Sequence, residues 1–180
     1  MMLSKENTLL LVIDIQEKIF QKMNEQVETE ANILRLIEGS KVLDIPIVWT
    51  EQYPKGLGRT IKSVRNALQG HEVLKKITFS CLDESKIRNK IESYKKKQIL
   101  ICGIETHVCV YQTAIDLMER NFEVHIVSDT VMSRKDLNYH IALDKLRDMG
   151  AQITSMEMAL FELQKVAKGD TFKAISEIIK

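Results

Sequence analysis

Short, continuous apolar segments constrain the fold of this chain more than any other feature of its sequence. They alternate with stretches in which apolar residues recur at spacings of three and four, as on one face of a helix. Continuous apolar strands are typical of a parallel sheet that is covered on both faces. Six strands are predicted, at residues 8–13, 45–50, 73–79, 98–102, 124–127 and 152–154.

Strands that alternate with helices predict an α/β protein with right-handed crossovers. We therefore expect a three-layer α/β/α, Rossmann-like fold with a six-stranded, mainly parallel sheet. The chain has 180 residues and contains no Ser/Gly-rich linker or repeat, so residues 1–180 are predicted to form a single domain. The helical pattern of residues 155–180 fits packing on the sheet or on another subunit, and the sequence leaves both open.

The charge balance argues against polyanionic partners. The chain has 26 basic and 25 acidic residues, a formal net charge of +1, and no phosphate-binding glycine motif. The apolar run at residues 9–13 is far shorter than the roughly 20 residues of a membrane span. We expect a small-molecule substrate, no nucleic acid and no membrane, and the lack of a signal-peptide pattern predicts a cytoplasmic protein.

The cysteines and histidines indicate neither disulfides nor a metal site. Cys81, Cys102 and Cys109 are odd in number and form no C-x-x-C pair, so reduced thiols are expected. The four histidines are scattered without the spacing of zinc ligands. No metal and no other cofactor is predicted.

Three polar residues stand where ligands bind in parallel sheets, beyond the carboxyl ends of strands. Asp14 follows the first predicted strand, and Lys76 projects from the third strand opposite to Lys75. Cys109 follows the fourth strand, and Thr106 is a reasonable helix cap that would place it near the third helical residue. There the helix dipole and unpaired N–H groups favour a thiolate.

Each of these residues also has a structural interpretation. Cys109 fits a buried cysteine packed beside valines, Asp14 fits a carboxylate that caps a turn, and Lys76 fits a solvated lysine on an edge strand. Taken one at a time, the residues leave both interpretations open.

Several segments together resemble one family, the isochorismatase-like cysteine hydrolases. They are V-I-D-I-Q at residues 12–16, K-I-T-F-S at 76–80 and G-I-E-T-H-V-C-V at 103–110, which match in order and spacing. The segment T-E-Q-Y-P-K-G-L-G at 50–58 resembles the subgroup of isochorismatase domain-containing proteins. The resemblance covers almost the whole chain.

The resemblance implies a role for each candidate residue. It makes Cys109 the nucleophile, Asp14 the general base, and Lys76 the cation that holds the carboxylate and the thiolate together. It also implies a cis peptide between Ile104 and Glu105, with the backbone N–H groups of Glu105 and Cys109 forming an oxyanion hole.

The neighbours of this triad are expected to line a substrate pocket, and Gln16, Phe20, Tyr53 and His107 are the candidates. Nicotinamidases of the family bind a metal through histidines after the second strand, which this chain lacks. True isochorismatases lack the catalytic cysteine that is present here as Cys109.

The resemblance therefore implies an amidase-like hydrolase that cleaves a small amide, carbamoyl or related acyl compound through a thioester on Cys109. Homo-oligomers are frequent in the family and are expected here. The alternative is a binding or scaffold protein of low turnover that keeps the hydrolase fold.

Overall fold

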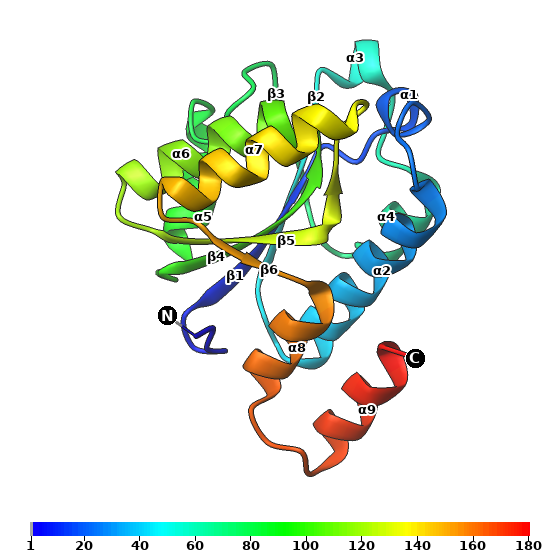
Figure 1. Cartoon of the computed structure of the whole chain (residues 1–180), viewed down its shortest axis with the longest axis vertical. Coiled ribbons are helices and arrows are strands. Elements are labelled where there is room, and N and C mark those ends of the chain that lie inside the picture. Colours follow the sequence, from blue (N-terminus) through cyan, green and yellow to red (C-terminus); the bar gives the residue numbers. More distant parts are fainter. Residues whose placement is uncertain (1) are drawn as a thin grey trace.

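A computed structural model of the chain describes residues 2–180 and shows a sheet enclosed by helices (Figure 1). In chain order the elements are β1 (Thr8–Ile13), α1 (Glu17–Phe20), α2 (Gln26–Val42), β2 (Ile47–Gln52), α3 (Pro54–Leu57), α4 (Lys62–Ala67), β3 (Val73–Lys76), α5 (Ser85–Ser93), β4 (Gln98–Ile104), η1 (Thr106–Val110), α6 (Tyr111–Glu119), β5 (Glu123–Met132), α7 (Asp136–Asp148), β6 (Gln152–Thr154), α8 (Met156–Gln164) and α9 (Asp170–Ile178).

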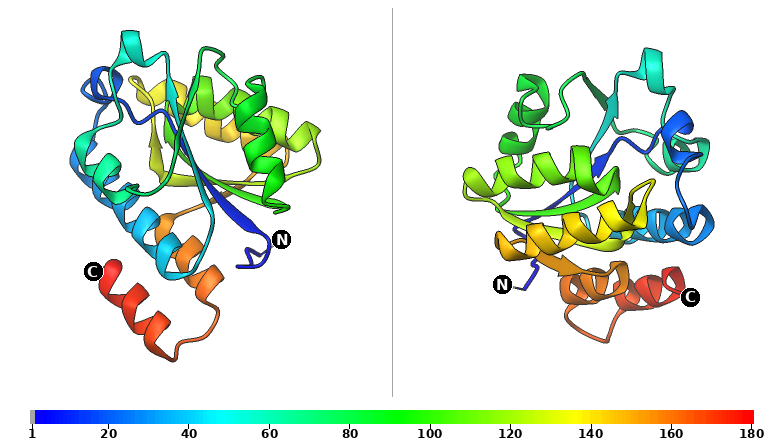
Figure 2. Two further views of the ribbon diagram at one scale, coloured as in Figure 1. Left: turned by 180° about the vertical axis from the view of Figure 1, so that it is seen from behind. Right: turned by 45° about the horizontal axis from the view of Figure 1, so that its top comes forward.

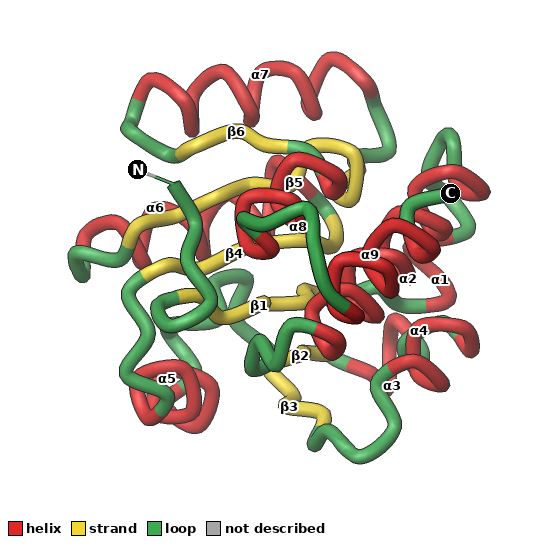
Figure 3. Tube along the Cα trace, turned by 90° about the horizontal axis from the view of Figure 1, so that it is seen from below, coloured by secondary structure: helices red, strands yellow, loops and turns green. Residues whose placement is uncertain are grey.

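The sheet has six strands in the order β3-β2-β1-β4-β5-β6, and every neighbouring pair is parallel. The chain first moves outward from β1 to β3 and then returns to add β4 on the other side of β1. Figure 3 shows the strands in this order, with α5 and α6 on one side and α2, α8 and α9 on the other. The predicted three-layer fold is confirmed, and the sheet is wholly rather than mainly parallel.

Alternate residues of β1 enter different cores, which explains its unbroken apolar sequence. Leu9, Leu11 and Ile13 pack with apolar residues of α5, α6 and α7. Leu10 and Val12 face the opposite way and pack with α2, α8 and α9. Because both faces of β1 are buried away from water, polar and apolar residues do not alternate in its sequence.

Some predicted strand boundaries are wrong. Strands β1 and β6 match the prediction, but β2 begins and ends two residues later than expected, at Ile47–Gln52. Strand β3 ends at Lys76 rather than at residue 79, because the chain folds back so that two following carbonyl groups accept hydrogen bonds from the Lys76 ammonium. Strands β4 and β5 are both longer than predicted.

The C-terminal helices pack on their own chain. Helices α8 and α9 lie against α2 in each view of Figures 1 and 2 and contact it. Leu160 and Leu163 of α8 and Ile175 of α9 are completely buried. Within residues 2–180, no helix combines the length and the apolar character needed to cross a membrane.

Gly103 lets β4 approach β1 closely at the end of the sheet where Asp14 lies. Its φ is 125°, and a Cβ atom at this position would lie 2.0 Å from the carbonyl oxygen of Ile13. Both the backbone conformation and the contact therefore require glycine. The residue after Ile13 is Asp14, so this close approach also fixes where Asp14 leaves the sheet.

We predict that Gly103→Ala lowers the free energy of unfolding by about 3 kcal/mol or more, because it combines a strained φ with a backbone clash. Gly70→Ala is the matched control, since Gly70 also has a positive φ but a Cβ there meets nothing within 4 Å. The control should lose only about 1 to 2 kcal/mol. Equal losses in urea unfolding of the two variants would show that the contact with Ile13 is unimportant.

Candidate active site

Asp14 leaves β1 at the point where the order of the strands reverses. Its backbone has a φ of 52°, and its side chain is buried. The hydroxyl of Thr50, on β2, donates a hydrogen bond of 2.7 Å to Asp14 Oδ1. The alternative of a carboxylate that only caps a turn does not describe this environment, because the second oxygen meets a cation.

That cation is the ammonium of Lys76, whose Nζ lies 2.6 Å from Asp14 Oδ2. Nζ also donates a hydrogen bond of 2.7 Å to Gln52 Oε1. Lys75, the residue before Lys76 on β3, is exposed. Burial disfavours the charged form of Lys76, but the Asp14 carboxylate opposes this and holds the pKa of Lys76 above its ordinary value. Lys76 is therefore not a solvated edge lysine.

Cys109 lies in η1, a short π-helical turn that leads directly into α6. The residue at the N-cap is Glu105 and not the predicted Thr106, which is the first residue of the turn. The Thr106 hydroxyl is buried and has no hydrogen-bond partner within residues 2–180. Cys109 is thus the fourth residue of the turn, one place later than predicted, because the chain enters the turn one residue earlier.

Cys109 is 6% exposed, and its sulfur lies 4.0 Å from Gln52 Oε1. Burial raises the pKa of the Cys109 thiol, and the Asp14 carboxylate raises it further, as a negative charge and as a hydrogen-bond acceptor. Lys76 lowers it, but by less than burial raises it. Burial and the carboxylate therefore oppose the thiolate that the helix terminus is expected to favour.

The other two cysteines have different surroundings, and both are fully buried. Burial raises the pKa of Cys102, with no opposing charge. Cys81 was not singled out from the sequence, yet its sulfur lies 4.0 Å from the Thr50 hydroxyl. Burial raises the pKa of Cys81 to about 11, against the opposing influence of Lys76.

Glu105 anchors the entry to the turn that carries Cys109, and the peptide bond between Ile104 and Glu105 is cis. Its buried carboxylate accepts a hydrogen bond of 2.6 Å from Nε of Arg134 and lies 3.8 Å from Nε2 of His107. Its carbonyl oxygen accepts hydrogen bonds from the N–H groups of residues 108 and 110, on either side of Cys109. Arg134 is a site neighbour that sequence reasoning did not find.

Two of the four predicted pocket residues are buried and make contacts within the protein. The amide of the fully buried Gln16 accepts a hydrogen bond from the Gln52 N–H at 2.6 Å and donates to the carbonyl groups of Gln52 and Gly58. Phe20 packs in the apolar core. Both side chains are buried, and the Gln16 amide links the ends of two segments that border the site.

The other two predicted pocket residues are more accessible. Tyr53 is 52% exposed and directly follows Gln52. His107 is partly buried, with its Nδ1 2.9 Å from the hydroxyl of Ser133. Tyr53 follows the residue that accepts a hydrogen bond from Lys76, and His107 is two residues before Cys109 in the chain.

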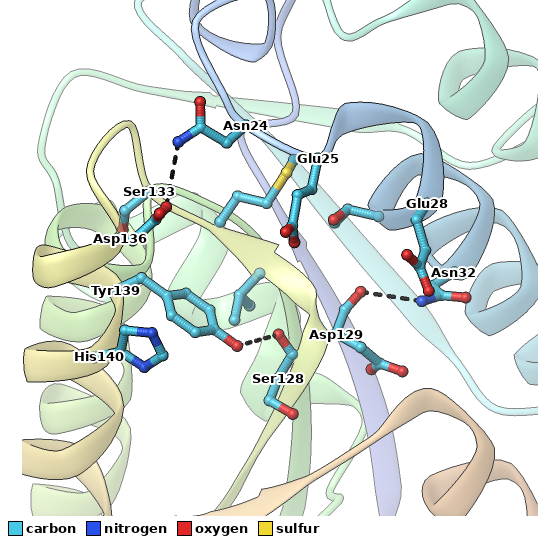
Figure 4. A pocket seen from close by; sticks show the side chains of 13 residues that line it. Asn24, Glu25, Glu28, Asn32, Ser128, Asp129, Ser133, Asp136, Tyr139 and His140 are labelled. Carbon is cyan, nitrogen blue, oxygen red and sulfur yellow. Dashed lines mark hydrogen bonds between the residues drawn. The ribbon is translucent and has the colours of Figure 1, made fainter.

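A cavity of about 450 Å³ lies at the same end of the sheet, between α2, β5 and α7 (Figure 4). Its lining includes Glu25, Glu28, Asp129 and Asp136, but none of the three candidate catalytic residues. Asn24 donates a hydrogen bond of 3.2 Å to Asp136 across it. In the described part of the chain, no group of three or more His, Cys, Asp or Glu residues could hold a metal ion.

The fold and this cluster define a class: a doubly wound α/β protein with a thiol next to a buried carboxylate–ammonium pair, at the point where the strand order reverses. The model of the isochorismatase domain family matches residues 8–158. The chain belongs to this family of isochorismatase-like hydrolases.

Two relatives support this assignment, and a third protein shares the fold. Isochorismatase domain-containing protein 2 of Danio rerio is 36% identical over 178 residues, which cover 98% of this chain and 89% of the relative. A structure named as MAR1 ribonuclease from Caenorhabditis elegans is 33% identical, has a TM-score of 0.93 and is matched over 99% of this chain and 92% of its own. The YcaC gene product of Escherichia coli, described as an octameric hydrolase of unknown specificity, has a TM-score of 0.94 at 21% identity, with 99% and 89% coverage.

We predict that Lys76→Met lowers the free energy of unfolding by about 3 to 5 kcal/mol, because it leaves the Asp14 carboxylate buried without its cation. The double variant with Asp14→Asn should lose less than the sum of the two single changes, since no lone charge remains. Lys75→Met, at the exposed neighbouring position, should change stability by less than about 0.5 kcal/mol. Urea unfolding measures all four, and equal effects at positions 75 and 76 would contradict a stabilising ion pair.

Proposed function

We propose that this protein is a cysteine hydrolase that cleaves a small amide, carbamoyl or related acyl compound through a thioester on Cys109. The observation that carries the proposal is the position of the Cys109 thiol beside the buried Asp14–Lys76 pair. Both charges also influence the Cys81 thiol, but Cys81 is fully buried, and only for Cys109 does Asp14 also act as a hydrogen-bond acceptor. The same three residue types supply a nucleophile, a base and a compensating charge.

In the first step, the thiol proton moves to the Asp14 carboxylate as the sulfur attacks the carbonyl carbon of the substrate. The backbone N–H groups of Glu105 and Cys109 donate hydrogen bonds to the carbonyl oxygen and stabilise the negative charge that develops on it. The carbon–nitrogen bond then breaks, and the amine leaves with the proton held by Asp14. The acyl group remains on sulfur as a thioester.

In the second step, Asp14 accepts a proton from a water molecule that attacks the thioester carbon. The carbon–sulfur bond breaks, the carboxylic acid is released, and the proton returns from Asp14 to the sulfur. Lys76 remains an ammonium throughout, because its role is to compensate the negative charge of Asp14 or of the sulfur. No metal or organic cofactor is needed for this sequence.

The names of the relatives suggest two other substrates. The family is named for isochorismate, and one solved structure carries the name ribonuclease. Neither chemistry explains a thiol beside a carboxylate, and the formal net charge of +1 gives the chain no general attraction for RNA. Both compounds therefore serve as comparison substrates in the test below.

We predict that a panel of small amides and carbamoyl compounds contains a substrate from which the protein releases ammonia, and that Cys109→Ala abolishes this activity without unfolding the chain. Cys102→Ala is the control, because it removes a buried thiol that lies outside the cluster. Isochorismate and an RNA oligonucleotide should not be cleaved. Turnover by Cys109→Ala would refute covalent catalysis, and tight binding without turnover would support a binding or scaffold protein.

We also propose that the chain forms a homo-oligomer, as YcaC does in its octameric structure. In support, Leu137 and Ile141 lie one turn apart on α7 and are 69% and 48% exposed, although they are large and apolar. Light scattering of the purified protein should give a multiple of 20.7 kDa, and substitution of both residues by glutamate should lower the mass. A wild-type mass of one chain would contradict the proposal.

A further inference from the structure

Gln52, the last residue of β2, is held in one orientation beside the candidate nucleophile. Its Nε2 donates a hydrogen bond of 2.6 Å to the Ile77 carbonyl, and its Oε1 accepts one of 2.7 Å from Lys76 Nζ. The backbone N–H and carbonyl groups of Gln52 both form hydrogen bonds with the side-chain amide of Gln16. A reversed amide would point its NH2 group at an ammonium, so the oxygen must face Lys76.

The Lys76 ammonium has no hydrogen left for the sulfur. Four oxygens lie within 3.2 Å of Nζ: Asp14 Oδ2, Gln52 Oε1 and the carbonyl oxygens of Thr78 and Phe79. An ammonium has three N–H bonds, so these acceptors already exceed its donors. Gln52 Oε1 is one of these four acceptors, and it carries no charge.

The same oxygen also faces the nucleophile, at 4.0 Å from Cys109 Sγ. A protonated thiol can donate toward an amide oxygen or a carboxylate, whereas a thiolate is repelled by both. The charged or titratable groups that influence Cys109 are Asp14, Lys76 and Cys81. Of these, only Lys76 favours the thiolate, and Gln52 takes one of its hydrogen bonds.

We propose that Gln52 is a positioning residue, whose amide oxygen is shared by the Lys76 ammonium and the Cys109 thiol so that the sulfur stays protonated until a substrate arrives. This rests on the proposed function, in which Cys109 is the nucleophile. Its consequence is protection: a resting thiol reacts slowly with unrelated electrophiles, because the thiolate is the reactive form. The substrate then triggers the transfer of the proton to Asp14.

Alkylation of Cys109 by iodoacetamide tests this without any hydrolysis assay. Rates are measured from pH 7 to 9.5 for the wild type, Gln52→Met and Gln52→Glu, with peptide mapping to separate Cys109 from Cys81 and Cys102. Gln52→Met removes the amide oxygen that faces the thiol and favours its protonated form, so alkylation should be about threefold faster. That value corresponds to a pKa lower by one unit, which raises the thiolate fraction about tenfold and lowers its nucleophilicity about threefold.

Gln52→Glu places a second carboxylate beside the sulfur, and alkylation should be about threefold slower at the same pH. Cys109→Ala is the control, because it should lose the label at position 109 and so confirms the assignment of the peptide. If Gln52→Met does not fold by circular dichroism, Gln52→Glu still tests the proposal, since it keeps an acceptor for Lys76.

Opposite shifts for the two Gln52 variants, or slower alkylation of a folded Gln52→Glu alone, support the proposal. Equal rates, or shifts in the same direction, would overturn it and leave Gln52 as a packing residue. Failure of the hydrolase proposal is a separate result, because it is seen as turnover in Cys109→Ala or as the lack of any cleaved amide. Neither of those results changes the alkylation rates.

Discussion

The buried ion pair between Lys76 and Asp14 is the interaction on which the candidate site depends. Each ion loses hydration worth several kcal/mol when it is buried, so it persists only where protein groups replace the water. Thr50 and Gln52 supply part of this replacement, and carbonyl groups of residues 78 and 79 supply the rest. This requirement explains why β3 is short: the chain must turn back over the ammonium to bring those carbonyl groups within reach.

The order of the strands decides which residues can meet. Asp14 follows β1 and Cys109 follows β4, and these neighbouring strands are where the strand order reverses. Lys76 lies on β3, with β2 between it and β1, and only a long side chain spans that separation. Lys76 therefore reaches Asp14 past residues of β2, and two of these flank the ion pair: Thr50 contacts Asp14 and Gln52 contacts Lys76. The strand order therefore determines the positions of Thr50 and Gln52 as well as those of the three candidate catalytic residues.

The sequence predicted the parallel sheet because unbroken apolar strands, such as residues 8–13, reflect burial on both faces and are local signals. It did not predict the role of Gln52, which depends on register between β2 and β3 and on a turn whose shape no local pattern encodes. The groups that oppose a Cys109 thiolate are also nonlocal. A helix terminus can be recognised in the sequence and contributes up to about 2 kcal/mol, but burial and a facing carboxylate depend on the whole fold and outweigh it.

In the proposed reaction the resting thiol is protonated, and this suits a buried site. Before attack, the cluster contains the Asp14 carboxylate, the Lys76 ammonium and a neutral thiol. In the proposed reaction, the proton passes from sulfur to Asp14, and the cluster then contains a neutral acid, the same ammonium and a thiolate. The formal charge is zero before and after, so the step moves an ion pair rather than creating a charge in a medium where a lone charge is costly. The ammonium must therefore stay fixed while its partner changes, and the four oxygens around Lys76 Nζ provide that fixation.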